Sequence, residues 1–518
     1  MICASSLLLV SALAFAAVRV DEQTVSAADG VKLYTRAVVP GEGKFPCVFV
    51  RTPYPSRAEL EKPYPFAAAT NDVYVKRGYV HVVQHCRGFG RSEGFCTPYV
   101  EREDGLAALA WIRRQPWYNG EIFLVGGSYT TTVHLLYLAT EPPDVKGADF
   151  SIQTDRMYFR DYRNGCNHSC CNVGWIRYMM SREYPDAKST DGAVRRPYCD
   201  IAKRVFGKDI PGYTARLMHT ECDEFWTGAQ NFDVMEHIKF PVLWREGLYD
   251  FYIEGMVSMW ERMLPEWKEK SVFELCPMAH GGTPLKDTPI PYGKQSGVMD
   301  SISFFDAIRR GENVAGGGTV RYHSLGSGTW RTGVWPRDVK FRELTFPTAE
   351  RGWTYDPKGP RIPGLDEGKC QRSWEPGSRR DATEFVSGTF DKAARFFGKP
   401  RIRVPVKSDC EDTQFFFRLD LVHPDGSAWN LCQTISSLRH AKKDYRPGEI
   451  VVLDLELPLT AFTVNPGWAV RLDVCSDGGV YVQHANVAKH WALVTDDEVK
   501  VAHNAVAAGT VELKLPLE

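Results

Sequence analysis

The 518-residue chain has no excess of either charge, with 63 Lys and Arg residues against 64 Asp and Glu residues. The net charge of −1 provides no basic surface for a phosphate backbone, which argues against nucleic-acid binding. Low-complexity segments and internal repeats are also absent. A composition with 43% hydrophobic and 25% charged residues excludes a disordered chain and a coiled coil, and is typical of a globular protein of several domains.

The sequence offers no hydrophobic run that predicts a membrane span. The apolar run near the N-terminus, from residue 7 to residue 18, has about a dozen residues, whereas a spanning helix needs about 20. The tripeptide AFA at 14–16 has the A-x-A arrangement that signal peptidase accepts, although no Lys or Arg precedes the run. We therefore expect residues 1–17 to be a signal peptide, cleaved after Ala16 or Ala17, and the protein to be exported to the periplasm or the extracellular space.

The 14 cysteines lack the spacing of a disulfide framework, which a chain of this size does not need. Cys166, Cys170 and Cys171, with His168 between them, have the residue types of a zinc site. Adjacent Cys170 and Cys171 do not easily point at one metal together with Cys166, so a local disulfide or plain packing is favoured. We expect neither a metal nor an organic cofactor.

Short β runs alternate with helical patterns in the first part of the chain, which is typical of an α/β domain. The apolar run EIFLV at 121–125 predicts a buried parallel strand. This alternation stops between residues 155 and 239, and from residue 320 strand-like runs joined by turn signals indicate an all-β sandwich. The predicted parts are a signal peptide (1–17), an α/β domain (24–154 and 240–312), a helical cap insertion (155–239) and a C-terminal sandwich (320–518).

The strongest catalytic signal is the segment VGGSY at 125–129, which follows the EIFLV strand and precedes an apolar helical pattern. A serine on such a turn exposes its hydroxyl beside the N–H groups of a helix N-terminus. A bare G-x-S also occurs where a serine only caps a helix. In α/β-hydrolases the nucleophile, the acid and the histidine follow in that order, and Asp250 and His280 complete it. We predict that Ser128 is the nucleophile, His280 the general base and Asp250 the residue that orients it.

Distinctive short motifs flank the predicted triad and continue to the C-terminal part of the chain. They are RTPY at 51–54, RGFGRSEG at 87–94, WYNG at 117–120, GLYD at 247–250, WR at 330–331, WP at 335–336, SD at 408–409 and DT at 412–413. These motifs resemble those of a known family, which includes cocaine esterase, X-Pro dipeptidyl-peptidases and the α-amino-acid ester hydrolases or glutaryl acylases. The resemblance covers essentially the whole mature chain and implies an α/β-hydrolase core, an inserted helical cap and a C-terminal jelly roll. It also implies an oxyanion hole made by the hydroxyl of Tyr54 and the backbone N–H of Tyr129.

Four residues near these motifs depart from the family pattern. Thr131 and Cys276 stand where Gly is usual, His85 where Asp is usual, and Met278 where Trp is common. None belongs to the predicted triad. We expect them to alter loop support and substrate choice more than the chemistry.

The substrate is predicted from a few residues of the cap. A substrate with a free amino group needs carboxylates to bind its ammonium, and Glu221 and Asp223 are the candidates. Acidic residues before a helix are also common partners of the helix dipole. Trp175 and Trp226 are candidates for the wall of an acyl pocket, or for the core of the cap.

Together these features predict an exported serine hydrolase that cleaves a small ester, an amide or a short peptide, as an X-Pro dipeptidyl-peptidase does, through an acyl-enzyme on Ser128. One alternative is an acyl ester hydrolase or glutaryl-type acylase without peptidase activity. The alternative from another class is a non-catalytic secreted protein whose jelly roll binds a glycan or a protein. An oligomer is compatible with the sequence.

Overall fold

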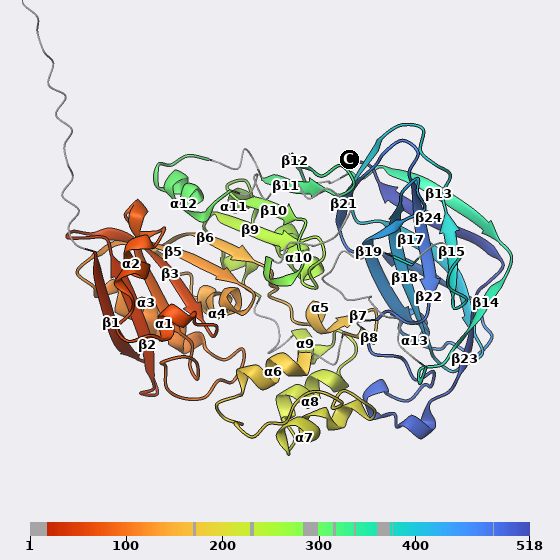
Figure 1. Ribbon diagram of the computed structural model, residues 1–518, viewed down its shortest axis with the longest axis horizontal. Helices are drawn as coiled ribbons and strands as arrows, with labels where there is room; N and C mark the ends of the chain where they lie inside the picture. Colours follow the sequence, from red (N-terminus) through yellow and green to blue (C-terminus); the bar gives the residue numbers. More distant parts are fainter. Residues whose placement is uncertain are drawn as a thin grey trace, which may run out of the picture.

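The computed structural model describes residues 18–168, 172–227, 233–282, 299–313, 318–335, 338–359, 373–374, 377–479 and 481–518. The predicted signal peptide and the cysteines 170 and 171 lie outside these residues. The described part contains a mixed α/β domain, a largely helical cap and a C-terminal β-sandwich (Figure 1). This confirms the predicted fold class.

Within the described residues, ten strands form the sheet of the α/β domain. The sheet is parallel from β4 to β11, and β1, β2 and β12 pair in antiparallel fashion at its two edges. In spatial order the strands are β1 (Arg19–Ser26), β2 (Lys32–Val39), β4 (Val80–His85), β3 (Phe45–Thr52), β5 (Tyr118–Gly127), β6 (Val145–Ser151), β9 (Val242–Gly247), β10 (Val272–Cys276), β11 (Thr319–Ser324) and β12 (Thr329–Val334).

Helices pack on both faces of this sheet, which is why its central strands are continuous apolar runs. Along β5, Ile122 and Leu124 belong to one buried cluster, whereas Phe123 belongs to another together with Phe304 and Phe305 of α12. No helix in the described ranges is long and apolar enough to cross a membrane. The helices of this domain are α1 (Arg57–Leu60), α2 (Phe66–Asn71), η1 (Val75–Arg77), α3 (Arg102–Arg113), α4 (Tyr129–Leu138), α10 (Ile253–Arg262), α11 (Pro265–Lys268), η5 (His280–Gly282) and α12 (Ser301–Arg309).

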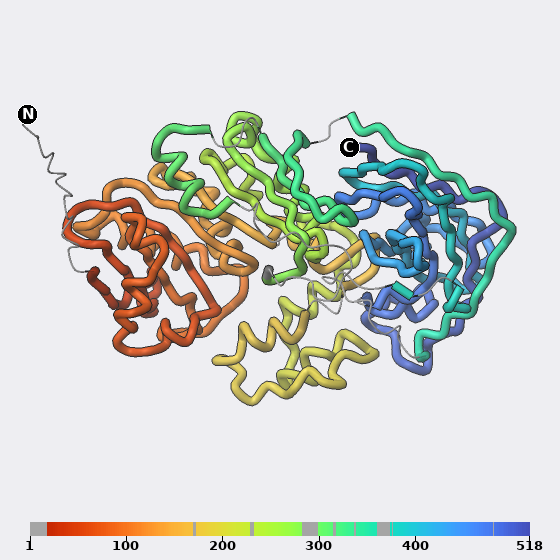
Figure 2. Tube along the Cα trace, turned by 45° about the horizontal axis from the view of Figure 1, so that its top comes forward, coloured from red at the N-terminus to blue at the C-terminus, as the bar shows by residue number. Residues whose placement is uncertain are grey.

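The cap is inserted between β6 and β9, and its buried residues, among them Tyr162 and Trp226, form one cluster with Trp491 of the C-terminal domain. In Figures 1 and 2 it is the yellow to yellow-green segment, next to both the α/β domain and the blue sandwich. Its elements are α5 (Tyr158–Asp161), β7 (Tyr162–Arg163), β8 (Cys166–Asn167), α6 (Val173–Met179), η3 (Tyr198–Asp200), α7 (Ile201–Phe206), α8 (Pro211–Met218), α9 (Glu224–Thr227) and η4 (Met235–His237).

The C-terminal sandwich is built from antiparallel strands that form two main sheets. One sheet has the order β13-β24-β17-β23-β14, with β20 on β17, and the other has the order β15-β22-β18-β19, while β16 pairs with β21. Its elements are β13 (Phe341–Thr348), β14 (Arg351–Tyr355), β15 (Ala382–Val386), β16 (Ala394–Gly398), β17 (Arg401–Ser408), β18 (Gln414–Val422), β19 (Ala428–Ser437), α13 (Leu438–Ala441), β20 (Val451–Glu456), β21 (Thr460–Val464), β22 (Ala469–Cys475), η6 (Trp491–Leu493), η7 (Asp496–Glu498), β23 (Ala502–Val506) and β24 (Gly509–Pro516).

The first two strands of the predicted C-terminal segment (320–518) pair with the core sheet. Strands β11 and β12 extend the sheet of the α/β domain, and the strands of the sandwich sheets begin at β13. Tyr322 of β11 stacks on Phe397 of β16 with ring centroids 4.1 Å apart and an interplanar angle of 2°. One buried cluster therefore continues from the core sheet into the sandwich.

Candidate active site

Ser128 occupies the turn between β5 and α4 with φ 55° and ψ −130°. Positive φ is unfavourable for a residue with a side chain, and such strain is typical of functional sites. The turn needs its two preceding glycines, because a Cβ on Gly126 would lie 2.5 Å from the carbonyl oxygen of Thr130, and one on Gly127 would lie 2.9 Å from Ser151 Oγ. The local sequence thus explains why the serine hydroxyl is presented at this point.

Ser128, His280 and Asp250 form a continuous chain of contacts. Ser128 Oγ lies 3.0 Å from His280 Nε2, and His280 Nδ1 lies 2.8 Å from Asp250 Oδ2. Because a carboxylate only accepts hydrogen bonds, it favours the tautomer with the proton on Nδ1 and leaves Nε2 as the acceptor for the serine proton. The buried Asp250 also accepts a hydrogen bond from the backbone N–H of Tyr252 at 2.9 Å.

The acid and the histidine follow neighbouring parallel strands. Asp250 comes after β9, and His280 comes after β10, which pairs with β9. The carboxyl ends of adjacent parallel strands meet at one edge of the sheet, where ligands bind in open α/β folds. The imidazole stacks on Phe251, with ring centroids 4.5 Å apart, and this contact limits its rotation.

Glu246, on β9, is a buried carboxyl group near the triad that sequence analysis missed. It accepts a hydrogen bond from the N–H of Gly247 at 2.7 Å. Burial and the neighbouring Asp250 raise the pKa of Glu246 well above its usual value, which favours its neutral form. The carboxyl group that contacts His280 is that of Asp250.

Tyr54 and Tyr129, the residues of the predicted oxyanion hole, line the same cavity as Ser128. Tyr54 follows β3, and burial raises the pKa of its hydroxyl to about 12, so this group keeps its proton at neutral pH. Tyr129 is the first residue of α4. Its N–H belongs to the first turn, where backbone donors have no intrahelical acceptor. The two groups are thus available to a developing negative charge beside Ser128.

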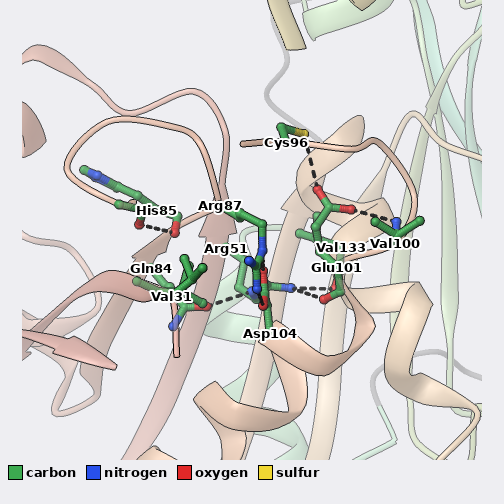
Figure 3. A network of polar contacts seen from close by, with 12 residues as sticks. Val31, Arg51, Gln84, His85, Arg87, Cys96, Val100, Glu101, Asp104 and Val133 are labelled. Carbon is green, nitrogen blue, oxygen red and sulfur yellow. Dashed lines mark hydrogen bonds and ion pairs between the residues drawn. The ribbon is translucent and has the colours of Figure 1, made fainter. Parts of the chain in front are cut away.

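Glu101 anchors the side chain of Tyr129, and no sequence motif indicated this role. Its carboxylate oxygens lie 2.7 and 2.8 Å from the Tyr129 hydroxyl, which donates to them. The carboxylate also accepts from the N–H of Val100 at 3.1 Å, and Figure 3 shows these two residues together with Cys96. Burial is the main cause of the raised pKa of Glu101. The contact fixes the first residue of α4 behind the nucleophile.

Arg51, the first residue of the RTPY motif, has a structural place in the same region. It is fully buried and donates to Gln84 Oε1 at 2.9 Å. Its Nη1 donates to the carbonyl oxygens of Glu101 at 3.2 Å and Val133 at 3.3 Å (Figure 3). One side chain therefore ties β3 to β4 and to the helices that flank the nucleophile.

Two of the departures from the family pattern have contacts that explain how they are accommodated. His85 Nδ1 accepts a hydrogen bond from the N–H of Arg91 at 3.1 Å, and burial lowers the His85 pKa to about 4, which keeps the ring neutral. Thr131 Oγ1 donates to the carbonyl oxygen of Ser151 at 3.2 Å. His85 supports the loop that follows β4, and Thr131 links α4 to β6.

Ser128 and His280 line a cavity of about 800 Å³. Trp175, Asn172 and Arg160 contribute to it from the cap, and Met278 and Cys276 from the end of β10. None of the described residues that line it is Asp or Glu, whereas Arg160 and Arg245 are both present. The described lining is therefore rich in aromatic side chains and has no carboxylate. Its two guanidiniums pair with residues that do not line it, Arg160 with Asp161 at 3.6 Å and Arg245 with Asp149 at 3.2 Å.

Of the two tryptophans predicted to form an acyl pocket, one lines the cavity and the other does not. Trp175 lines the cavity, but Trp226 is buried in the cap core and donates its indole N–H to the carbonyl of His219 at 2.8 Å.

The two predicted ammonium ligands are not among the described lining residues of this cavity. Glu221 lies in a separate cavity between the cap and the sandwich, where it pairs with His440 at 3.1 Å and Lys443 at 3.4 Å. Asp223 pairs with His219 at 2.6 Å. Both carboxylates thus have partners outside the described lining of the cavity at Ser128.

The cysteine cluster gives no metal site that can be described. Cys166 is buried, and its predicted partners Cys170 and Cys171 lie outside the described residues. Within the described ranges, no group of three or more His, Cys, Asp or Glu side chains is arranged to hold a metal ion.

The chain is similar to known proteins over most of its length. Residues 29–281 match the sequence model of the X-Pro dipeptidyl-peptidase (S15 family), and residues 318–507 match that of the X-Pro dipeptidyl-peptidase C-terminal non-catalytic domain. Cocaine esterase from Rhodococcus sp. (strain MB1 Bresler) is 24% identical, over 93% of this chain and 95% of its own length.

Two solved structures share the fold over nearly the whole chain. An aminopeptidase from the marine sediment archaeon Thaumarchaeota archaeon has a TM-score of 0.81 at 19% identity, over 97% of both chains. An α-amino acid ester hydrolase has a TM-score of 0.78 at 18% identity, over 99% of this chain and 98% of its own. With both sequence models matched in order along its length, the chain is a serine hydrolase that belongs to the family of cocaine esterase and the X-Pro dipeptidyl-peptidases.

Proposed function

We propose that this serine hydrolase is exported and cleaves an ester or amide in two steps, through an acyl-enzyme on Ser128. The observation that carries the proposal is the Ser128–His280–Asp250 chain of contacts, with separations of 3.0 and 2.8 Å, at a cavity large enough for a small substrate.

In the first step His280 Nε2 takes the Ser128 proton while Oγ attacks the carbonyl carbon. The carbonyl oxygen becomes an oxyanion, which accepts hydrogen bonds from the Tyr54 hydroxyl and the Tyr129 N–H. His280 then gives its proton to the leaving alcohol or amine, and the acyl group stays on the serine. In the second step His280 takes a proton from water, the resulting hydroxide attacks the acyl carbon, and the acid is released as Ser128 regains its proton.

The cavity favours an acyl group without an ammonium, and therefore an acyl ester or amide hydrolase over an X-Pro dipeptidyl-peptidase. A dipeptidyl-peptidase must accommodate the free amino terminus of its substrate, and a like charge beside it is unfavourable. The described lining offers Arg160 and Arg245 and no carboxylate. Carboxylates outside the described lining pair with both guanidiniums, since Asp161 lies 3.6 Å from Arg160 and Asp149 lies 3.2 Å from Arg245. The preference is therefore attributed to the lack of a carboxylate among the described lining residues.

The preference for an acyl group without an ammonium can be measured with two substrates whose acyl groups have the same length. We expect the hexanoyl 4-nitroanilide to be cleaved with a kcat/KM about 10- to 100-fold above that of the 6-aminohexanoyl 4-nitroanilide, because the described lining contains two guanidiniums and no carboxylate that could pair with the ammonium. The variant Arg160→Gln removes one guanidinium from the lining and should bring the kcat/KM values of the two substrates closer together. A higher kcat/KM for the ammonium substrate, or rapid cleavage of an X-Pro 4-nitroanilide, would restore the dipeptidyl-peptidase alternative.

Export is tested separately from catalysis. Expression of the full chain in a bacterium, followed by N-terminal sequencing of the enzyme recovered outside the cytoplasm, should give a mature chain that begins at Ala17 or Val18. Recovery of the activity only from the cytoplasm, on a chain that still begins at Met1, would contradict export and leave the active-site proposal untouched.

A further inference from the structure

Helix α6 of the cap (Val173–Met179) brings an indole to the wall of the cavity from a fixed backbone position. Its N-cap residue Asn172 has a left-handed conformation, with φ 54° and ψ 55°, and its side-chain oxygen accepts a hydrogen bond from the N–H of Trp175 at 3.3 Å. This N-cap hydrogen bond stabilises the first turn of α6. Asn172 and Trp175 both line the cavity that contains Ser128.

Two side chains of α6 donate hydrogen bonds to the segment that contains Tyr54. Trp175 Nε1 donates to the Tyr54 hydroxyl oxygen at 2.8 Å, and the Tyr178 hydroxyl donates to the carbonyl oxygen of Pro53 at 2.7 Å. The ring of Tyr178 also stacks on that of Tyr54, with centroids 5.7 Å apart and an interplanar angle of 23°. Residues three apart on a helix share a face, so the two hydrogen bonds act together as a clamp.

The same indole contacts the residue that supplies the other donor of the oxyanion hole. Its ring centroid lies 5.2 Å from that of Tyr129, whose hydroxyl is anchored on Glu101 at 2.7 Å. Trp175 therefore touches both residues on which the proposed oxyanion hole depends.

The direction of the Trp175–Tyr54 hydrogen bond determines what the tyrosine can do. An indole N–H is only a donor, so the Tyr54 oxygen must accept and its single proton is directed to another acceptor. Tyr54 and Ser128 line the same cavity, so that proton is available to an oxygen beside the serine. Accepting a hydrogen bond also polarises the O–H group, which makes it a better donor.

We propose that Trp175 is a positioning residue, which directs the Tyr54 hydroxyl towards the oxyanion. The inference rests on the proposed acyl-enzyme function and gives the cap a part in transition-state stabilisation. Burial raises the pKa of Tyr54, while the bond from Trp175 works in the opposite direction, as expected for a donor that favours negative charge on this oxygen.

Steady-state kinetics of three variants on one chromogenic ester test the proposal. Trp175→Phe keeps an aromatic ring and removes the N–H, and should lower kcat about tenfold with KM changed by less than about twofold. Tyr54→Phe should lower kcat by about 10²-fold, as the loss of an oxyanion donor does. The double variant should be no slower than Tyr54→Phe, because the indole acts through the tyrosine hydroxyl.

Trp226→Phe is the matched control. It removes an indole hydrogen bond of the same 2.8 Å length in the core of the cap, outside the described lining of the cavity, and should leave kcat at the wild-type value. If Trp175→Phe yields no folded protein, Trp175 can be replaced by 3-benzothienylalanine, which has nearly the same shape and no N–H, and the same loss in kcat is expected.

Multiplicative losses in the double variant, or a Trp175→Phe effect confined to KM, would overturn the positioning role. A failure of the proposed function would look different. In that case Ser128→Ala would also keep the wild-type rate, and the Tyr54 and Trp175 substitutions would carry no information about an oxyanion.

Discussion

Replacing Ser128 by alanine is expected to lower kcat by about 10⁶-fold on any ester that the wild-type enzyme cleaves. The substitution removes the oxygen that lies 3.0 Å from His280 Nε2 and leaves the oxyanion donors Tyr54 and Tyr129 in place. The residual rate above that in water would then measure what binding and the oxyanion hole provide without the nucleophile.

Thr130→Ala is a matched control for this result. Thr130 lies two residues after the nucleophile and lines the same cavity, and its hydroxyl hydrogen-bonds with the backbone N–H and the carbonyl oxygen of Gly127. Its loss should cost about tenfold or less in kcat, through the geometry of the turn. Similar losses in the two variants would mean that the turn, and not the Ser128 hydroxyl, carries the activity.

The second large effect is expected for Asp250→Asn, which should lower kcat by about 10⁴-fold. Asparagine has nearly the same shape, but its amide nitrogen is a donor, so it favours the tautomer of His280 with the proton on Nε2. In that tautomer the histidine cannot accept the proton of Ser128. Steady-state kinetics at neutral pH measure this directly.

Glu246→Gln is the control for Asp250→Asn, because both remove a buried carboxyl group near the histidine. Since burial raises the pKa of Glu246 well above its usual value and favours its neutral form, glutamine should replace it with a kcat within about threefold of the wild-type value. If Glu246→Gln reduced kcat as much as Asp250→Asn, the charge that orients His280 would have to be shared between the two carboxyl groups.

Chain order and strand boundaries were sufficient to predict the groups that the structure brings together at Ser128. The strand-like EIFLV run and the glycines before the serine place Ser128 at the end of β5, and Asp250 and His280 each follow a parallel strand. Such positions are predictable because the carboxyl ends of neighbouring parallel strands converge on one edge of the sheet.

Contacts between the cap and the core were not predictable in the same way. The Trp175–Tyr54 bond joins residues 121 positions apart, and the Glu101–Tyr129 contact joins residues 28 positions apart. Neither pair leaves a periodic signal in the sequence. For the same reason the sequence identified Glu221 and Asp223 as acidic candidates but could not predict their partners. In the structure Glu221 pairs with His440 and Asp223 with His219, outside the described lining of the cavity at Ser128.

The most direct measurement of the central claim is mass spectrometry of the enzyme quenched with acid during turnover of a 4-nitrophenyl ester. Peptide mapping should place one acyl group on Ser128 of the wild-type enzyme, and Ser128→Ala should carry none. An acyl group on another residue would contradict the proposed mechanism. The absence of any adduct, together with a failure of Ser128 to react with a fluorophosphonate, would instead favour a non-catalytic protein that binds a ligand through its jelly roll.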